Sequence, residues 1–151
     1  MKRLKTAIYT AMASNPRLVA LLGHPDAISQ AWPAQEAKYT DSQPGDTYEN
    51  LPLVDPPRAR LTFVLVAPVK DRDLPKRDDT FQLSVMSPNA DLVEEIIAEC
   101  EDTLDQDSSG FSQFPIEANI KETYCTRGPD LYESDTRIFH TTLNLRVLWN
   151  P

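Results

Sequence analysis

The sequence predicts an α+β fold in which helices pack on one face of a mostly antiparallel sheet. Three observations lead to this prediction: a very long strand pattern from Asp135 to Trp149, an earlier pair of strands that forms a hairpin, and a strongly periodic helix between them. With 151 residues, the chain is large enough to bury one core without disulfides or metals. We therefore expect a single domain over residues 1–151.

The final strand is predicted from the alternation of its side chains. Successive side chains point to opposite faces of a strand. The largely apolar face consists of Phe139, Thr141, Leu143, Leu145, Val147 and Trp149. The mostly polar face consists of His140, Thr142, Asn144, Arg146 and Leu148. Such a strand exceeds the usual five or six residues, so part of it is expected to extend beyond its own sheet toward a partner. Trp149 is either a core residue that continues the apolar face or an anchor at a rim that a partner covers.

The N-terminal residues predict two short helices. Apolar residues from Leu4 to Met12 follow helical spacing. Asn15 and Pro16 then supply an N-cap and a first-turn proline for a second helix that ends at Gly23. The apolar stretch between Thr6 and Thr10 is too short for a secretory signal, so we expect no secretion.

A long segment from His24 to Arg58 has no periodicity and is punctuated by prolines. Loops of more than about fifteen residues inside a compact domain are usually functional or disordered. Three spaced aromatic residues, Trp32, Tyr39 and Tyr48, favour docking onto a neighbour. This segment is therefore a candidate contact region.

The next two strands are expected to form a hairpin. Arg60 to Ala67 has two mostly apolar faces, and Thr80 to Ser87 alternates apolar and polar residues. The segment from Val69 to Asp79 is expected to project as a charged tip, whose four basic and four acidic residues are Lys70, Arg72, Lys76 and Arg77, and Asp71, Asp73, Asp78 and Asp79. This balance does not produce the one-signed field of a nucleic-acid patch, and self-pairing of exposed charges explains it more simply.

A strongly acidic helix follows the cap at Ser87-Pro88-Asn89. Its apolar residues recur at every fourth position, at Leu92, Ile96, Cys100 and Leu104. The segment from Asn89 to Asp107 contains eight acidic residues and no Lys or Arg. Removing these eight from the total of 23 leaves 15, which equals the 15 basic residues, so one segment carries the whole net charge of -8.

The acidic helix face has several interpretations. A single convex helix face cannot wrap a Ca²⁺ or Mg²⁺ ion, which leaves a lumen surface that repels DNA, a contact with a basic partner, or an ordinary solvated flank. Asp105 and Asp107 stand at the helix C-terminus, where the helix dipole disfavours anions, and this placement favours a basic partner surface. Beyond this helix, apolar residues from Ile116 to Tyr124 predict a strand, and Arg127-Gly128-Pro129 is expected to turn the chain into the final strand.

The residue inventory disfavours catalysis. The sequence has no Gly-x-Ser-x-Gly elbow and no glycine loop for phosphates, and its four glycines fall in predicted turns. His24 and His140 belong to no cluster with metal spacing, and Cys100 and Cys125 suit a reducing cytosol, where they serve as small buried hydrophobes. We expect no catalytic residue, no cofactor and no metal. No apolar run approaches the length of a membrane span.

Several segments together resemble the tail terminator or tail completion proteins of long-tailed, siphovirus-like bacteriophages. They are the helical start ending in Leu21-Leu22-Gly23, the hairpin strand Asp79-Thr80-Phe81-Gln82-Leu83-Ser84-Val85, the helix from Asp91, and the finish that begins Tyr132-Glu133-Ser134-Asp135-Thr136-Arg137-Ile138-Phe139-His140 and continues through Leu143 to Val147. The resemblance is best from Thr80 to Trp149. The segment from Gly23 to Arg58 departs from it, because it is long and proline-rich for that family.

The resemblance implies a structural virion protein of the tail or neck that is made in the host cytoplasm. Such proteins form rings, commonly hexameric, which cap the tail tube and join it to the head connector while genomic DNA passes through the centre. They use no cofactor, catalyse nothing and contact no membrane. The alternatives are a head-completion or stopper protein of the neck, a small monomeric binding module, or a small-molecule enzyme.

Candidate contact residues follow from these patterns. They are Trp32, Tyr39 and Tyr48 of the long segment, Val64 and Val66 on the outward face of the first long strand, Lys70, Arg72, Lys76 and Arg77 of the hairpin tip, Asp105 and Asp107 at the helix end, and Arg146 and Trp149 of the final strand. The expected partners are identical copies, the tail tube protein and the connector.

Overall fold

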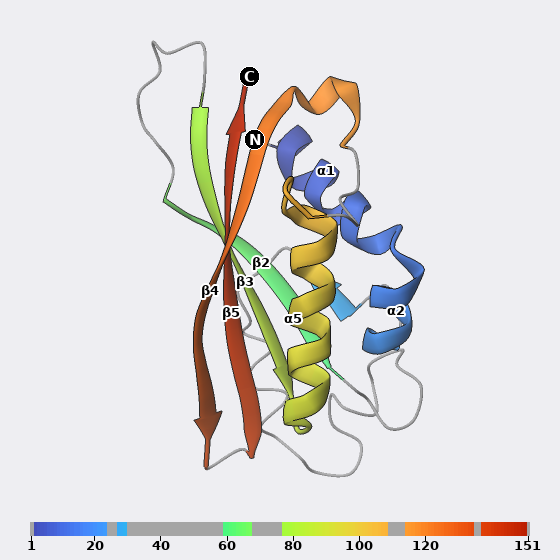
Figure 1. Ribbon diagram of the computed structural model, residues 1–151, viewed down its shortest axis with the longest axis vertical. Coiled ribbons are helices and arrows are strands. Elements are labelled where there is room, and N and C mark those ends of the chain that lie inside the picture. The colour runs from blue at the N-terminus through green and yellow to red at the C-terminus, as the bar shows by residue number, and fades with distance from the viewer. Residues whose placement is uncertain are drawn as a thin grey trace.

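The computed structural model describes residues 2–23, 27–29, 59–67, 77–108, 114–134 and 137–150. Along the chain the elements are α1 (Lys2–Ala13), α2 (Pro16–Leu22), β1 (Ile28–Ser29), β2 (Arg60–Ala67), β3 (Arg77–Ser87), α5 (Ala90–Leu104), the 3-10 helix η2 (Ile116–Ala118), β4 (Ile120–Glu133) and β5 (Ile138–Trp149). The α-helices lie on one side of the sheet (Figure 1). The predicted α+β architecture is confirmed.

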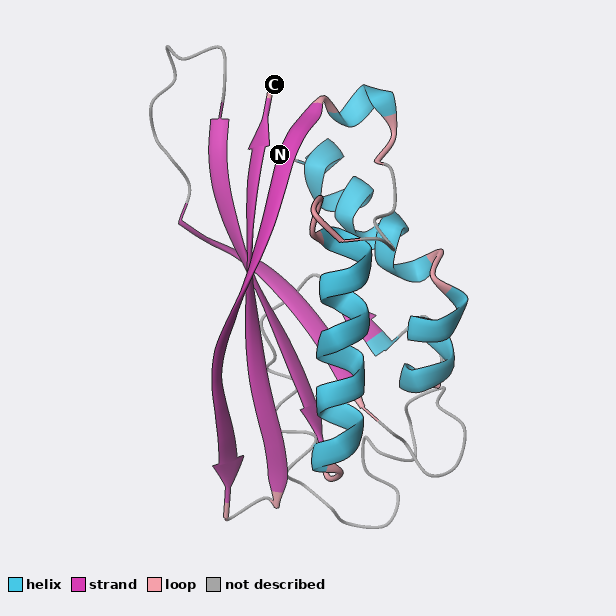
Figure 2. Cartoon of the chain, viewed as in Figure 1, coloured by secondary structure: helices cyan, strands magenta, loops and turns pink. Residues whose placement is uncertain are grey.

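The sheet has the strand order β1-β2-β3-β5-β4 (Figure 2). Every neighbouring pair is antiparallel except β1 and β2, in which Ile28 and Ser29 pair in parallel with Leu61 and Thr62. Strand β1 falls inside the segment predicted as a loop, because two residues give no detectable periodicity. The two chain ends lie at the same end of the sheet (Figure 1).

The expectation that the last strand extends beyond its sheet is wrong. β5 is paired along its length on both sides, from Trp149 to Phe139 with β3 and from Trp149 to Ile138 with β4. It is long because both of its neighbours are long. Its predicted faces are confirmed in its second half, where Leu143, Leu145 and Val147 are buried and the residues between them are exposed.

The expected turn at Arg127-Gly128-Pro129 is also wrong. β4 continues to Glu133 through a bulge between Arg127 and Asp130, and it begins only at Ile120, after a 3-10 turn. A proline is tolerated there because β4 is at the edge of the sheet, and a bulge can absorb a residue that cannot donate to the ladder. The chain reverses between Glu133 and Ile138 instead.

The hairpin of β2 and β3 is present, but β3 starts at Arg77, three residues before the predicted start. Arg77, Asp78 and Asp79 therefore belong to the strand and not to the tip. Residues 68–76 lie outside the described residues.

Both predicted helix starts are confirmed by their caps. The Asn15 side chain accepts hydrogen bonds from the backbone N–H groups of Arg17 and Leu18, and Asn89 caps α5 in the same way. Gly23 ends α2 in the left-handed conformation, at φ 95°. The core lies between the helices and one sheet face, and its largest fully buried side chains include Phe63, Phe81, Leu4, Ile8, Met12 and Leu83.

Candidate assembly surfaces

Among the described elements, no helix packs on the second face of the sheet, which we call the open face (Figure 2). Only part of this face is exposed, because six residues that lie on it by register are buried: Arg60, Thr62, Ser84, Met86, His140 and Thr142. Val64, Gln82, Asn144 and Thr126 stand in one row across it, in register from β2 to β4. These side chains are partly or fully exposed. The middle of this face is therefore polar and uncharged, apart from the apolar Val64.

Arg146 also lies on the open face, and its charge is already paired. Its guanidinium donates to both carboxylate oxygens of Asp78, at 2.6 to 3.0 Å, and this hydrogen bonding raises the pKa of Arg146. The candidate residue Arg146 is thus held within its own subunit. The pair neutralises both charges on this face.

The end of the sheet that adjoins residues 68–76 carries a buried polar cluster. Asp79 is fully buried, its carboxylate accepts a hydrogen bond from the Trp149 indole at 2.6 Å, and it forms an ion pair with Arg77 at 3.3 Å. The Arg77 guanidinium also stands 5.7 Å from the centre of the Trp149 ring. Trp149 is 4 % exposed, so the structure places it in the core and not as an exposed anchor at a rim.

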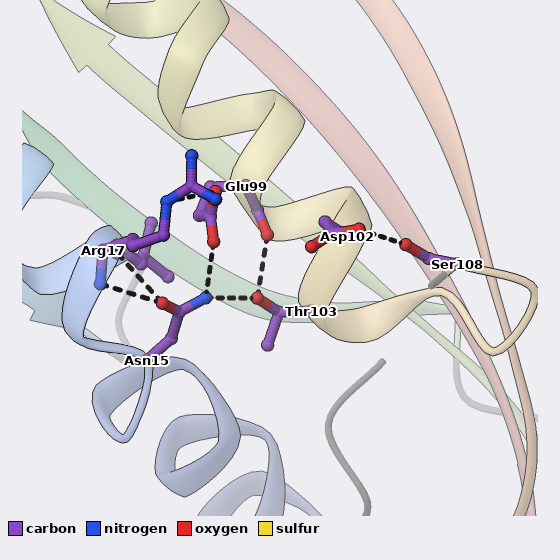
Figure 3. Close-up of polar contacts among 7 residues, drawn as sticks. Asn15, Arg17, Glu99, Asp102, Thr103 and Ser108 are labelled. Atoms are coloured by element: carbon purple, nitrogen blue, oxygen red, sulfur yellow. Dashed lines mark hydrogen bonds and ion pairs between the residues drawn. The ribbon is translucent and has the colours of Figure 1, made fainter. Parts of the chain in front are cut away.

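Much of the acidic run on α5 forms internal contacts. Glu99 is buried, and its carboxylate accepts a hydrogen bond from the Asn15 amide at 2.9 Å, while the same amide donates to Thr103 Oγ1 at 2.6 Å (Figure 3). Asp102 accepts a hydrogen bond from Ser108 Oγ at 2.5 Å (Figure 3). The N-cap of α2 is therefore tied to the last turns of α5.

Asp105, which is predicted to face a basic partner, connects α5 to β4 within the chain. Its Oδ2 accepts a hydrogen bond from the Cys125 N–H at 3.0 Å, and its Oδ1 accepts one from the Asp107 N–H at 2.9 Å. The next residue, Gln106, bonds to both backbone groups of Thr123. We call Asp105 and Gln106 the hook. These backbone contacts give the acid at this helix end a role within the single chain, and its predicted contact with a partner stays a prediction.

Two more acids of α5, Glu94 and Glu101, form ion pairs with Arg127 of β4. These contacts raise the pKa of Arg127. Asp107 is exposed and lines a shallow depression with Glu101, Asp102 and Asp105. The acidic side chains of this surface are therefore at least partly exposed to solvent, and Arg127 neutralises part of their charge.

Neither cysteine has the environment of a nucleophile. Burial raises the pKa of the Cys100 thiol, and burial together with the Asp105 carboxylate raises the pKa of Cys125 to about 12, so both stay protonated. Both are free thiols. The described residues contain no group of three or more His, Cys, Asp or Glu side chains placed to hold a metal ion. No helix in the described ranges is long and apolar enough to cross a bilayer.

The predicted contact residues are scattered in the structure. Trp32, Tyr39, Tyr48, Lys70, Arg72 and Lys76 lie outside the described residues, and Val64 and Val66 lie on β2, where the exposed fraction of Val66 is 47 %. The sequence interpretation missed Leu131 and Tyr132, which are 49 % and 54 % exposed near the end of β4. The sequence does not reveal this edge strand, because Gly128-Pro129 predicts a turn just before these two residues.

No protein-family model matches the chain, and no curated protein matches its sequence. Among solved structures, a chain described as "Virion of native gene transfer agent (GTA) particle" has the same fold, with a TM-score of 0.63. The match covers 97 % of this chain and 94 % of that chain at 14 % sequence identity. At this identity the likeness establishes a shared fold.

Proposed function

We propose that this chain is a structural virion protein of a phage-like particle. In this proposal its copies form a ring, most simply a hexamer, that terminates the tail tube and joins it to the head connector. DNA passes through the centre without sequence-specific binding. The protein works by assembly and not by catalysis.

The observation that carries the proposal is the fold likeness to a virion chain along nearly the whole length of both proteins. The sequence segments that resemble tail terminators support the more specific role, because they lie on the hairpin, α5 and β5, which build the framework of the fold. A second support is the open face, whose row of uncharged polar side chains and paired Arg146 offer little to hold phosphates.

The most direct test is to image particles assembled without this chain. Overlong tails without attached heads are expected if it terminates the tube. Tails of normal length that fail to join heads point to a stopper of the neck instead. Normal, infectious particles contradict both assignments.

The purified protein provides an independent test. Sedimentation and electron microscopy are expected to detect a closed annulus at high concentration. A single-chain mass at all concentrations, together with no ring at the end of tails, contradicts the proposal and favours a monomeric binding module.

A further inference from the structure

We propose that the copies in the ring join head to tail through opposite charges, with the basic helices α1 and α2 of one copy against the acidic solvent side of α5 in the next. This inference rests on the proposed function and specifies its subunit contact. The partner of both surfaces is a second copy of this chain.

The two parts of the helix layer carry opposite charge. Residues 1–23, which include α1 and α2, contain no acidic residue and four basic ones: Lys2, Arg3, Lys5 and Arg17. Residues 89–107, which include α5 and the hook, contain eight acidic residues and no Lys or Arg. Each part therefore has a field of one sign.

The sheet places these two parts toward opposite edges. α1 contacts β1, which is the first strand in the order β1-β2-β3-β5-β4, whereas α5 contacts β3, β5 and β4. In Figure 1, α1 and α2 accordingly lie on the side of α5 that is turned away from β4 and β5. Two different surfaces that attract one another generate a head-to-tail contact, which forms a ring when the rotation closes. A two-fold contact between two α5 surfaces would instead bring acid against acid.

The acidic surface is exposed in the single chain. Asp91, Glu95 and Ala98 are exposed, and Asp102 follows them on the same side of α5, one turn further along. The ion pairs among the described residues do not include Asp91 or Glu95. These two carboxylates are therefore available to a partner.

The basic surface is exposed as well. Arg3 is exposed, Lys5 is partly exposed, and the side chain of Arg17 is 81 % exposed. The Arg3 guanidinium donates to the backbone carbonyl of Glu117 at 3.2 Å, and this neutral acceptor does not cancel its charge. The other exposed residues of these helices are small, so a second helix surface can approach closely. They include Thr6, Thr10, Ser14 and Ala20.

The two surfaces overlap in height, which a closed ring requires. A rotation about an axis parallel to α5 moves no copy along that axis. The Arg17 side chain lies 3.8 Å from Glu99 of α5, so α2 is level with part of that helix. Arg3 to Ala13 spans about 15 Å along α1, and Asp91 to Asp102 spans about 17 Å along α5. The two charged rows are thus of similar length.

Charge reversal on one surface at a time tests the contact. One variant combines Arg3→Glu with Arg17→Glu, and the other combines Asp91→Lys with Glu95→Lys. Each variant alone is expected to lower the population of rings at least tenfold, as measured by sedimentation and electron microscopy. The melting temperature of each variant checks that it is folded.

Mixing the two separately purified variants separates a contact between copies from one within a chain. This separation is needed because residues 24–58 contain six acidic residues and two basic ones, which could attract the basic helices internally. In an even-numbered ring the two variants can alternate, so that every contact again joins an acidic surface to a basic one. The equimolar mixture is therefore expected to recover rings.

The matched control makes the same change in net charge elsewhere. Lys121→Glu combined with Arg137→Glu replaces two exposed cations that lie outside α1, α2 and α5. This control is expected to form rings as the wild type does. A loss equal to that of Arg3→Glu with Arg17→Glu would assign the effect to net charge and overturn the inference.

Salt provides a test that needs no substitution. Screening by salt shortens the reach of surface charges to about 10 Å at 0.1 M and about 3 Å at 1 M ionic strength. The population of wild-type rings is therefore expected to fall at least tenfold between about 0.05 M and about 0.5 M sodium chloride. An unchanged population overturns the charge contact.

The outcomes separate this inference from the proposed function. Wild-type levels of rings from either charge-reversal variant overturn the contact and leave the proposed function standing. A loss that mixing does not restore also overturns it, because charges that act within one chain gain nothing from a second variant. A wild-type protein that never forms rings contradicts both proposals.

Discussion

Trp149 ends β5 with both parts of its side chain engaged. The ring belongs to the core cluster, and the indole N–H donates to the buried carboxylate of Asp79. A buried carboxylate that loses a donor is destabilised by roughly 1–3 kcal/mol. The residue is therefore structural in the isolated subunit.

We accordingly predict that Trp149→Phe lowers the free energy of unfolding by about 2–3 kcal/mol, from the lost hydrogen bond and the smaller ring. Chemical denaturation measures this change. Ile116→Ala is the control, since an exposed substitution should change stability by less than about 0.5 kcal/mol. Equal stability of Trp149→Phe and wild type would mean that the Asp79 contact contributes nothing.

Gly128 faces a side chain across the β4–β5 ladder. A Cβ at this position would stand 2.0 Å from Thr142 Oγ1, far closer than a Cβ approaches an atom to which it is not bonded. We predict that Gly128→Ala destabilises the protein by about 1–3 kcal/mol through overpacking. Thermal unfolding of the single and double variants measures the effect.

Thr142→Ala is the matched partner of that substitution. Combined with Gly128→Ala it should recover most of the loss, because the colliding hydroxyl is removed. Purely additive effects of the two substitutions would show that the close approach is not the cause.

The hook couples the C-terminal end of α5 to the edge strand β4 through hydrogen bonds. Helix α5 ends at Leu104, and the two residues after it bond to the edge of β4. Asp105→Ala removes the acceptor of the Cys125 N–H, whereas Asp105→Asn keeps one oxygen that accepts from this N–H and loses only the second acceptor, which serves the Asp107 N–H. The two substitutions therefore separate the hydrogen bond from the charge.

We predict at least tenfold faster hydrogen exchange at the Cys125 amide in Asp105→Ala, and nearly unchanged exchange in Asp105→Asn. Amide exchange followed by NMR measures both. Faster exchange in both variants would assign the protection to the charge of Asp105.

The elements that could be predicted from the sequence are those with local signals. α5 has a four-residue apolar repeat and an Asn89 cap, and α2 has Asn15 and Gly23 at its two ends. The bulge at Gly128-Pro129 could not be predicted, because the same dipeptide serves as a turn or as a bulge depending on the strand beside it. The role of Asp105 was equally hidden, since its acceptor contact lies 20 residues further along the chain.

At the scale of the whole molecule, the excess acidic charge and the open face lie on opposite sides of the sheet. The acidic excess belongs to the segment around α5, on the helix side of the sheet (Figure 1). The uncharged polar residues Gln82, Asn144 and Thr126 lie in one row on the open face. The sequence located the excess charge but could not assign it to a side, because that requires the order of the strands.

If the protein forms the proposed ring, the two chain ends at the same end of the sheet give that ring a readable polarity. A bulky domain fused to either terminus would project from the same pole of the annulus. It would obstruct one junction, toward the tube or toward the capsid, and leave the opposite junction accessible. The junction that still forms in both fusions, either to the tube or to the capsid, lies at the pole opposite the two chain ends.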